Sequence, residues 1–159
     1  MGEKYVTLLR SEFLEGKMSN IEVKRFLRRY EQNTKKIDVL RTALDEKRSR
    51  LYSVSSPKLT GMPRGGVYKT KEDLVAEIEN IERRLSRAIK KGQTIKLEIL
   101  DVIDEVADAK YCRILELYYI EFKTLEQIAE EMNYSYRWIV DLYHQAIQAV
   151  VLPYAEGRD

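Results

Sequence analysis

The sequence predicts an all-α protein in which a long antiparallel helical hairpin, packed as a coiled coil, precedes a helix-turn-helix domain. Of the 159 residues, 44% are hydrophobic and 34% are charged, whereas only 7 are glycine and 3 are proline. This composition is typical of long helices. Apolar residues also recur at helical spacing along most of the chain. We therefore expect a coiled-coil region over residues 1–106 and the helix-turn-helix domain over residues 107–152.

Two helices are expected before residue 53. The first is short, is ended by Gly16, and has an apolar side made of Tyr5, Leu8, Leu9 and Phe13. The second begins at a capping box, in which the Ser19 hydroxyl and the Glu22 carboxylate bind amide groups that the first helical turn leaves unpaired. Its apolar seam continues up to Pro57 and includes Val23, Leu27, Tyr30, Ile37, Leu40, Leu44 and Leu51.

A basic loop is expected over residues 53–70, which read "SVSSPKLTGMPRGGVYKT". Two prolines and three glycines prevent a continuous helix there. Lys58, Arg64 and Lys69 give the loop a positive charge. Its "GMPRGG" stretch lacks the Gly-Lys-Ser/Thr ending of a phosphate-binding loop and follows no predicted strand, so it does not indicate a nucleotide site.

After residue 70 the apolar residues alternate steps of four and three, which is the heptad pattern of a coiled coil. They are Leu74, Ile78, Ile81, Leu85, Ala88, Gly92, Ile95, Ile99, Val102 and Val106. Gly92 in this seam allows a close backbone approach or a bend, or it only lowers helix stability by about 1 kcal/mol relative to alanine. The two long helices can form a hairpin or a dimeric bundle. We expect a homodimer, because two helices alone bury little surface.

Three shorter helices are expected in the last third of the chain, at about residues 107–120, 124–132 and 135–150. Thr124 and Gln127 form a second capping box, and Ser135 is a suitable N-cap. The third helix presents an apolar stripe for packing, namely Ile139, Tyr143, Ala146 and Val150. Ala129, in the middle of the second helix, allows the close crossing that a helix-turn-helix requires.

Further apolar side chains of the third helix lie off this stripe: Trp138, Val140, Leu142, Ile147 and Val151. A helix that is apolar nearly all round is normally buried by more than two neighbours. We therefore expect its outer face to be covered by something beyond the helix-turn-helix itself.

The segment "ILELYYIEFKTLEQIAEEMNYSYRWIVDLYHQAI" resembles region 4 of bacterial sigma factors. The matching residues are Leu117, Tyr119, Ile120, Ile128, Ala129, Ser135, Ile139, His144 and Ala146. Together with the coiled-coil half and the "SSPKLTGMPRGG" linker, the chain is similar to small phage and prophage proteins of Gram-positive bacteria that have the layout of ArpU- and RinA-type late transcription regulators. It departs from the pattern in having Arg137 as the one Lys or Arg of its last helix. Asn133 replaces the glycine that is common in the turn, which is tolerable because Asn enters the left-handed region readily.

This resemblance implies a cytoplasmic phage or prophage transcription regulator that binds double-stranded DNA as a dimer, with its third helix in the major groove. The contact residues are then those at the start of that helix: Ser135, Tyr136, Arg137, Trp138 and Asp141. Arg137 is expected to bind guanine, Ser135 to hold a phosphate, and Trp138 to contact a thymine methyl group or a sugar edge.

The net charge of +2 is unevenly distributed along the chain. Residues 17–71 contain 15 Lys/Arg and 5 Asp/Glu, residues 72–109 contain 6 and 10, and residues 110–159 contain 5 and 8. We therefore expect phosphate neutralisation from the first basic helix and the loop, through Lys35, Lys36, Arg41, Lys58, Arg64 and Lys69. A solvated helix face or a site for an acidic protein would show the same charge pattern.

The alternative function is an interaction module whose last helix docks through its apolar outer face onto RNA polymerase or another phage protein, without direct DNA contact. Region 4 of sigma factors binds both DNA and polymerase, so the resemblance supports either function.

Other classes of function are not expected. No nucleophile–base pair or paired-acid site can be assigned, which argues against an enzyme. With Cys112 as the single cysteine and His144 as the single histidine, we expect neither a Cys/His metal site nor a cofactor. The sequence also lacks a run of about 18 apolar residues and a signal-peptide layout, which predicts an intracellular protein without a membrane span.

Overall fold

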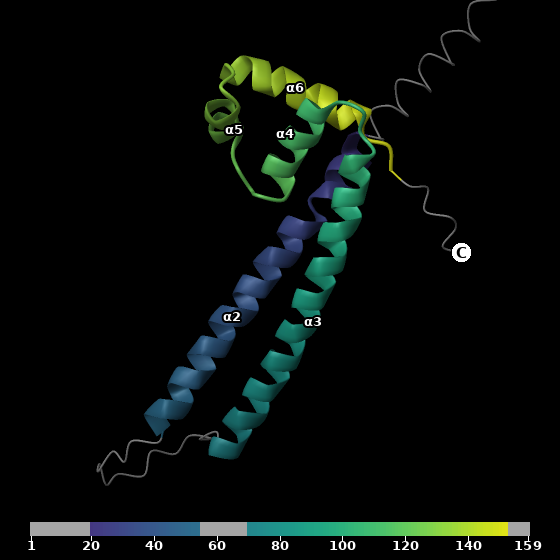
Figure 1. The fold of residues 1–159 in the computed structure, drawn as a ribbon. Helices are drawn as coiled ribbons and strands as arrows, with labels where there is room; N and C mark the ends of the chain where they lie inside the picture. The colour runs from purple at the N-terminus through teal and green to yellow at the C-terminus, as the bar shows by residue number, and fades with distance from the viewer. Residues whose placement is uncertain (1–19, 55–69, 153–159) are drawn as a thin grey trace, which may run out of the picture. The chain divides into compact units, whose positions relative to one another are not determined.

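The structure, a computed structural model, describes residues 20–54 and 70–152 (Figure 1). Its labelled helices are α2 (Arg29–Val54), α3 (Lys71–Asp104), α4 (Ala109–Tyr119), α5 (Leu125–Met132) and α6 (Tyr136–Ala149). No strand occurs in the described residues, which confirms the predicted all-α class. The short helix predicted around residues 5–13 and nearly all of the predicted loop lie outside the described ranges.

Residues 20–27 are also helical and continue into α2 through one turn residue, Arg28. The Arg28 N–H donates to the Lys24 carbonyl and the Gln32 N–H donates to the Arg28 carbonyl, each over 3.1 Å. Helical hydrogen bonding from residue i to i−4 therefore spans the turn. The single long helix predicted from the capping box at Ser19 is therefore interrupted by this one turn residue without loss of the hydrogen bonds across it, and Ser19 itself lies outside the described residues.

The chain divides into two compact units. The two-helix unit is Asn33–Gln93, which holds most of α2 and the larger part of α3. The core unit is Met1–Gln32 with Thr94–Asp159, and the structure describes residues 20–32 and 94–152 of it. Among the described residues, no helix has both the length and the apolar content that crossing a bilayer requires.

In the two-helix unit, α2 and α3 lie side by side and run antiparallel (Figure 1). The buried apolar side chains of this unit all belong to the predicted seams: Leu40, Leu44, Leu74, Ile78 and Ala88. Two ion pairs join the helices, Arg48 with Glu82 at 2.7 Å and Lys47 with Glu77 at 2.5 Å. Because all four side chains keep some solvent exposure, the apolar seam rather than the ion pairs stabilises the pairing.

Gly92 is buried where the two helices approach closely. A methyl group placed on Gly92 would lie 2.5 Å from Nδ2 of Asn33 and 3.7 Å from Cδ1 of Ile37. Asn33 is the one polar residue among the buried side chains described, and its Nδ2 donates to the Ala88 carbonyl over 3.0 Å. Of the roles considered for Gly92, the structure shows the close approach, because the missing side chain makes room for a buried hydrogen bond.

One cluster of apolar side chains forms the interior of the core unit. The three C-terminal helices contribute Ile114, Leu115, Leu117, Tyr119, Ile128, Ala129, Ile139, Leu142, Tyr143, Ala146 and Ile147. The preceding parts of the chain add Val23, Leu27, Ile95, Ile99, Val102, Ile103 and Val106. Since the cluster is continuous, α4, α5 and α6 share their core with residues 20–27 and with the end of α3.

This shared core bears on one expectation about the last helix. The apolar residues off its stripe were expected to be covered by something beyond the helix-turn-helix, and two of them, Leu142 and Ile147, are buried, with 6% and 2% of their surface exposed. The reason is that the additional apolar side chains from residues 20–27 and from α3 extend the cluster beyond α4 and α5. Trp138 and Val151 remain exposed, so the described residues do not provide the expected cover for these two side chains.

α4 begins two residues later than predicted, after a short non-helical connection from α3. α3 ends at Asp104, and Val106 is buried in the connection, where its N–H donates to the Ile103 carbonyl over 3.0 Å. Asp108 then caps α4, because its carboxylate accepts from the Lys110 N–H over 2.8 Å. This cap moves the start of the helix from the predicted residue 107 to residue 109.

Candidate nucleic-acid interface

α5 and α6 are joined by a tight turn whose conformation follows from its residues. The capping box predicted at the start of α5 is present, with Thr124 and Gln127 each accepting from the backbone N–H of the other. Asn133 ends α5 in the left-handed region, at φ 57° and ψ 44°, which asparagine adopts at lower cost than most residues. The Tyr134 N–H then donates to the Ala129 carbonyl over 2.9 Å and closes the turn.

The start of α6 is capped and open to solvent. Ser135 has an extended backbone and its hydroxyl accepts from the Trp138 N–H over 3.3 Å, which confirms it as the N-cap. Tyr136 and Trp138 have 51% and 50% of their surface exposed, and Arg137 is exposed between them. No carboxylate of the described residues lies within ion-pair distance of Arg137, so its guanidinium is available to a ligand.

The outward side of α6 is polar. Arg137, Asp141, His144 and Gln148 follow one another at steps of four and three residues, so they share one side of the helix, and all four are exposed. Asp141 was among the predicted contact residues, whereas His144 and Gln148 were not. The sequence feature that could have identified His144 and Gln148 is their spacing, at steps of three and four residues from Asp141 along the side of α6 that begins at Arg137.

The remaining predicted contact residues, Lys58, Arg64 and Lys69, lie outside the described residues. The structure therefore brings together only the five predicted residues of α6 and its N-cap. In the same described ranges, no group of three or more His, Cys, Asp or Glu side chains is arranged to hold a metal ion.

Two buried tyrosines anchor α6 on α4. The hydroxyl oxygens of Tyr119 and Tyr143 are 2.7 Å apart, and the Tyr118 ring contacts both rings at centroid distances of 4.9 and 5.0 Å. Burial raises the pKa of both Tyr119 and Tyr143. Nearer to solvent, the Tyr111 hydroxyl donates to Oε1 of Gln145 over 2.7 Å. These contacts fix which side of α6 faces outward.

Cys112 ties α4 to the end of α3. Its Sγ donates to the carbonyls of Ile103 and Val106, at 3.3 and 3.2 Å. The thiol is half-buried. Burial raises its pKa, which makes it a poorer nucleophile and fits a structural role.

An ion-pair network joins α4, α5 and the loop between them. Arg113 contacts Glu131 at 2.8 Å, Glu121 at 3.2 Å and Glu116 at 3.5 Å. Lys123 contacts Glu121 at 2.8 Å and also pairs with Glu131. Two cations thus face three carboxylates, so the positive charge of Arg113 and Lys123 is neutralised by neighbouring side chains at the surface and is not left for DNA phosphates.

This network should make stability depend on pH in acid. Hydrogen bonds from Lys123 lower the pKa of Glu121 and of Glu131. Because the folded-state pKa lies below the unfolded one, their stabilising contribution is complete above the unfolded pKa of about 4.3 and is lost as pH falls through the folded pKa. We expect Glu131→Gln to weaken the acid dependence of the free energy of unfolding, measured by urea denaturation between about pH 3 and pH 6.

Glu130→Gln is the matched control for this experiment. Glu130 is the exposed neighbour of Glu131 in α5, and it makes no ion pair with the described residues. The control should keep the pH dependence of the unaltered protein. Identical profiles for the two variants would show that the network contributes nothing to acid stability.

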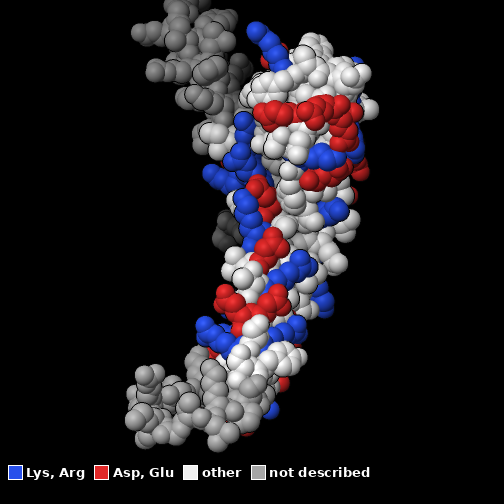
Figure 2. All heavy atoms as spheres, turned by 90° about the vertical axis from the view of Figure 1, so that its left-hand side faces the viewer, with Lys and Arg blue, Asp and Glu red and all other residues white. Residues whose placement is uncertain are grey.

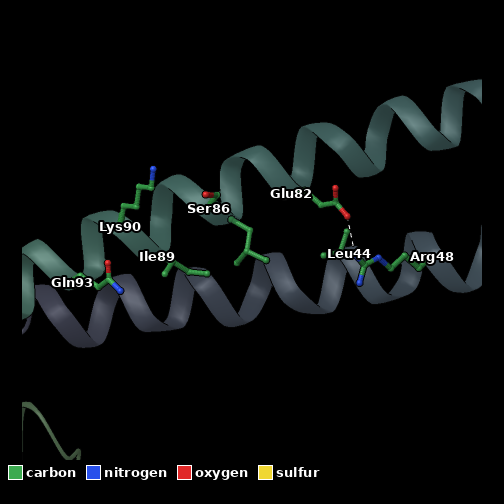
Figure 3. A pocket seen from close by; sticks show the side chains of 8 residues that line it. Leu44, Arg48, Glu82, Ser86, Ile89, Lys90 and Gln93 are labelled. Atoms are coloured by element: carbon green, nitrogen blue, oxygen red, sulfur yellow. Dashed lines mark hydrogen bonds and ion pairs between the residues drawn. The ribbon is translucent and has the colours of Figure 1, made fainter.

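An open groove lies between α2 and α3 in the two-helix unit (Figure 3). Its apolar floor includes Leu44, Leu85 and Ile89. The Arg48–Glu82 ion pair and Lys90 lie along its rim, and Lys90 points away from α2 (Figure 3). An open groove does not enclose a small molecule as a ligand site normally does.

The two units carry opposite net charge. The described residues of the core unit contain 9 Lys/Arg and 13 Asp/Glu, whereas those of the two-helix unit contain 12 and 8. Figure 2 shows acidic side chains gathered on the core unit and charges of both signs along the two-helix unit. The polar side of α6 therefore belongs to an acidic unit, and most of the positive charge lies in α2 and α3.

Comparison with known proteins gives one match. A family model described as "Protein of unknown function (DUF1492)" matches residues 53–150, a range that holds α3, α4, α5 and α6. No curated protein and no solved structure matches the chain.

Proposed function

We propose that the chain, which belongs to the DUF1492 family, is a phage or prophage transcription regulator that binds double-stranded DNA through α5 and α6 as a helix-turn-helix. The orientation of α6 supports this proposal. Its inner side is buried in the core unit, its outer side is polar, and its capped first turn exposes Arg137. Recognition helices contact base edges with the residues at their N-terminal end. The resemblance to sigma factor region 4 and to ArpU- and RinA-type regulators favours the same function.

Each residue at the start of α6 has a role in this proposal. Arg137 donates two parallel hydrogen bonds from its guanidinium group to O6 and N7 of guanine. Ser135 and the unpaired N–H groups of the first turn hold a phosphate. Trp138 contacts a thymine methyl group or a sugar edge, and Asp141 accepts a hydrogen bond from a cytosine amino group.

The remaining parts of the proposal concern assembly. α2 and α3 form a coiled-coil hairpin, and two copies of the chain form a homodimer that places one α6 in each half-site of the DNA. The centres of such half-sites are about 34–36 Å apart, or multiples of that distance, on one side of the duplex. A regulator of this kind acts in the cytoplasm.

A second candidate function is docking onto RNA polymerase or another phage protein without DNA contact. Tyr134, Tyr136 and Trp138 expose 38%, 51% and 50% of their surface near the start of α6, and aromatic side chains are frequent anchors of protein interfaces. The acidic excess of the core unit also disfavours DNA. Burial of Leu142 and Ile147, however, reduces the apolar outer face on which this function depends.

Arg137→Ala distinguishes DNA binding by α6 from docking onto a protein without DNA contact. We expect the variant to lose about 1–3 kcal/mol of binding free energy on the specific site and to relax its sequence preference. The site is obtained by selection from a pool of random duplexes, and binding is measured by fluorescence anisotropy at fixed salt. Arg50→Ala, which removes the same charge from an exposed position of α2, is the control and should keep the preference.

Two results would count against DNA reading by α6. One is equal sequence discrimination by the unaltered protein and Arg137→Ala. The other result has two parts: the unaltered protein enriches no sequence, and it retains purified RNA polymerase in a pull-down. If Trp138→Ala abolishes that retention, the second candidate function is established.

A further inference from the structure

We infer that one face of α3 binds the phosphate backbone of double-stranded nucleic acid. This basic face consists of Arg83, Arg84, Arg87, Lys90 and Lys91 in the two-helix unit. The inference rests on the proposed function, because the unit that carries α6 has an excess of acidic residues, and DNA binding then requires positive charge from elsewhere in the chain.

The five residues of the basic face are concentrated on one side of the helix. They occur within residues 83–91, and no Asp or Glu occurs between Glu82 and Glu98. At about 100° per residue, the five positions fall within about 120° of the helix circumference, and they extend about 12 Å along its axis. The side chains therefore form one compact surface and not a belt around the helix.

This surface faces solvent. All five residues are exposed, whereas Ala88 and Gly92, on the other side of α3, are buried. Figure 3 shows Lys90 pointing away from α2 while Ile89 points toward it. The Arg87 Nε donates to the Arg83 carbonyl over 3.3 Å, which holds that side chain along the helix surface.

Most of the basic face is not neutralised within the described part of the chain. Arg48 and Lys47 each pair with a carboxylate of α3. In contrast, no carboxylate of the described residues lies within ion-pair distance of Arg83, Arg84 or Lys91. These charges are therefore available to an external anion.

The neighbouring part of α2 adds to the positive charge. Asn33 donates to the Ala88 carbonyl, and Ile37 would contact a methyl group on Gly92, so residues 33–37 lie beside residues 88–92. Lys35 and Lys36 belong to this stretch, and both are exposed. The positive potential thus extends beyond α3 itself.

The chemistry of the face favours phosphate over a protein partner. Arginine binds phosphate through two parallel hydrogen bonds, and exposed cations at steps of three and four residues can contact successive phosphates. A protein interface of useful affinity requires buried apolar or aromatic anchors. Between residues 83 and 91 the large apolar side chains, Leu85 and Ile89, are only partly exposed and lie on the floor of the groove rather than on the basic face.

Charge averaged over long segments of the sequence does not indicate this face. Residues 72–109 have an acidic excess as a whole, although all six of their Lys/Arg fall between residues 83 and 96. Phosphate neutralisation was therefore predicted only for the preceding helix and the loop.

The test compares two triple variants of the full chain on a random-sequence duplex of about 30 base pairs. The face variant, Arg83→Gln/Arg87→Gln/Lys91→Gln, should flatten the slope of log affinity against log salt by up to about 2.7 units, since each lost phosphate contact removes about 0.9. Between about 50 and 200 mM salt, the unaltered protein should then lose up to about 40-fold more affinity than the face variant. The control variant, Arg25→Gln/Arg50→Gln/Lys71→Gln, removes two arginines and one lysine from exposed positions outside the basic face and should change the slope less.

Each outcome decides the inference separately from the proposed function. An unchanged slope in the face variant overturns the inference, even when Arg137→Ala confirms reading by α6. Equal effects of the two triple variants overturn it as well, because they show a dependence on net charge alone.

A labelled polyglutamate peptide that binds as tightly as the duplex, and is lost in the face variant, would assign the face to an acidic protein partner. A flattened slope in the face variant, with no effect of Arg137→Ala, supports the inference and rejects the proposed reading helix.

Discussion

Replacing Ala129 with leucine should lower the free energy of unfolding by about 1–3 kcal/mol, because a larger side chain overpacks a close contact between helices. Ala129 is 5% exposed and lies in the interior cluster of the core unit. Its carbonyl accepts from the Tyr134 N–H at the turn into α6, so the backbone here has little freedom to move away. Denaturation in urea, followed by circular dichroism, measures the change.

Glu130→Leu is the matched control for this substitution. Glu130 is the next residue of α5 and is exposed, so the same leucine there should change stability by no more than about 0.5 kcal/mol. Equal stabilities of the Ala129→Leu and Glu130→Leu variants would show that α5 does not approach its neighbours closely at Ala129. The helix-turn-helix proposed for this region would then lose its main packing argument.

The local features of the fold were predictable because neighbouring residues determine them. The capping box of Thr124 and Gln127, the cap at Ser135 and the suitability of Asn133 for the turn each depend on side chains within three or four positions of the backbone groups that they satisfy. The same holds for the exposed start of α6, where the predicted contact residues lie together because they share one helix. Helical periodicity predicted the buried stripe of α6 for the same reason.

Features that depend on distant parts of the chain were predicted only in outline. The apolar residues off the stripe of α6 indicated additional cover, but no periodicity within α6 indicates that residues 20–27 and α3 provide it for Leu142 and Ile147. The hydroxyl pair of Tyr119 and Tyr143 joins residues 24 positions apart, and the sequence offers other tyrosines for the same role. The polar outer side of α6 becomes visible only once this packing has fixed which side faces outward.

The second large effect concerns the two-helix unit. Gly92→Leu should lower its stability by about 1–5 kcal/mol, because two costs outweigh one gain. The new side chain overpacks the site at a cost of about 1–3 kcal/mol, and it displaces the Asn33 amide from the Ala88 carbonyl, leaving a buried donor unpaired at a cost of about 1–3 kcal/mol. The gain of about 1 kcal/mol in helix propensity opposes them. Gln93→Leu, at the exposed next position, is the control and should be nearly neutral.

Gly92→Ala, made in the unaltered protein and in an Asn33→Ala variant, tests whether Asn33 is the cause of the stability loss expected for Gly92→Leu. A methyl group on Gly92 would lie 2.5 Å from the Asn33 Nδ2, so Gly92→Ala should destabilise the unaltered protein despite its better helix propensity. In an Asn33→Ala background the colliding amide is absent, and Gly92→Ala should then stabilise by up to about 1 kcal/mol. Thermal unfolding of the four proteins gives the coupling free energy between the two positions. A coupling near zero would mean that Gly92 is required by the backbones of α2 and α3 themselves, and that the buried asparagine merely occupies the space beside them.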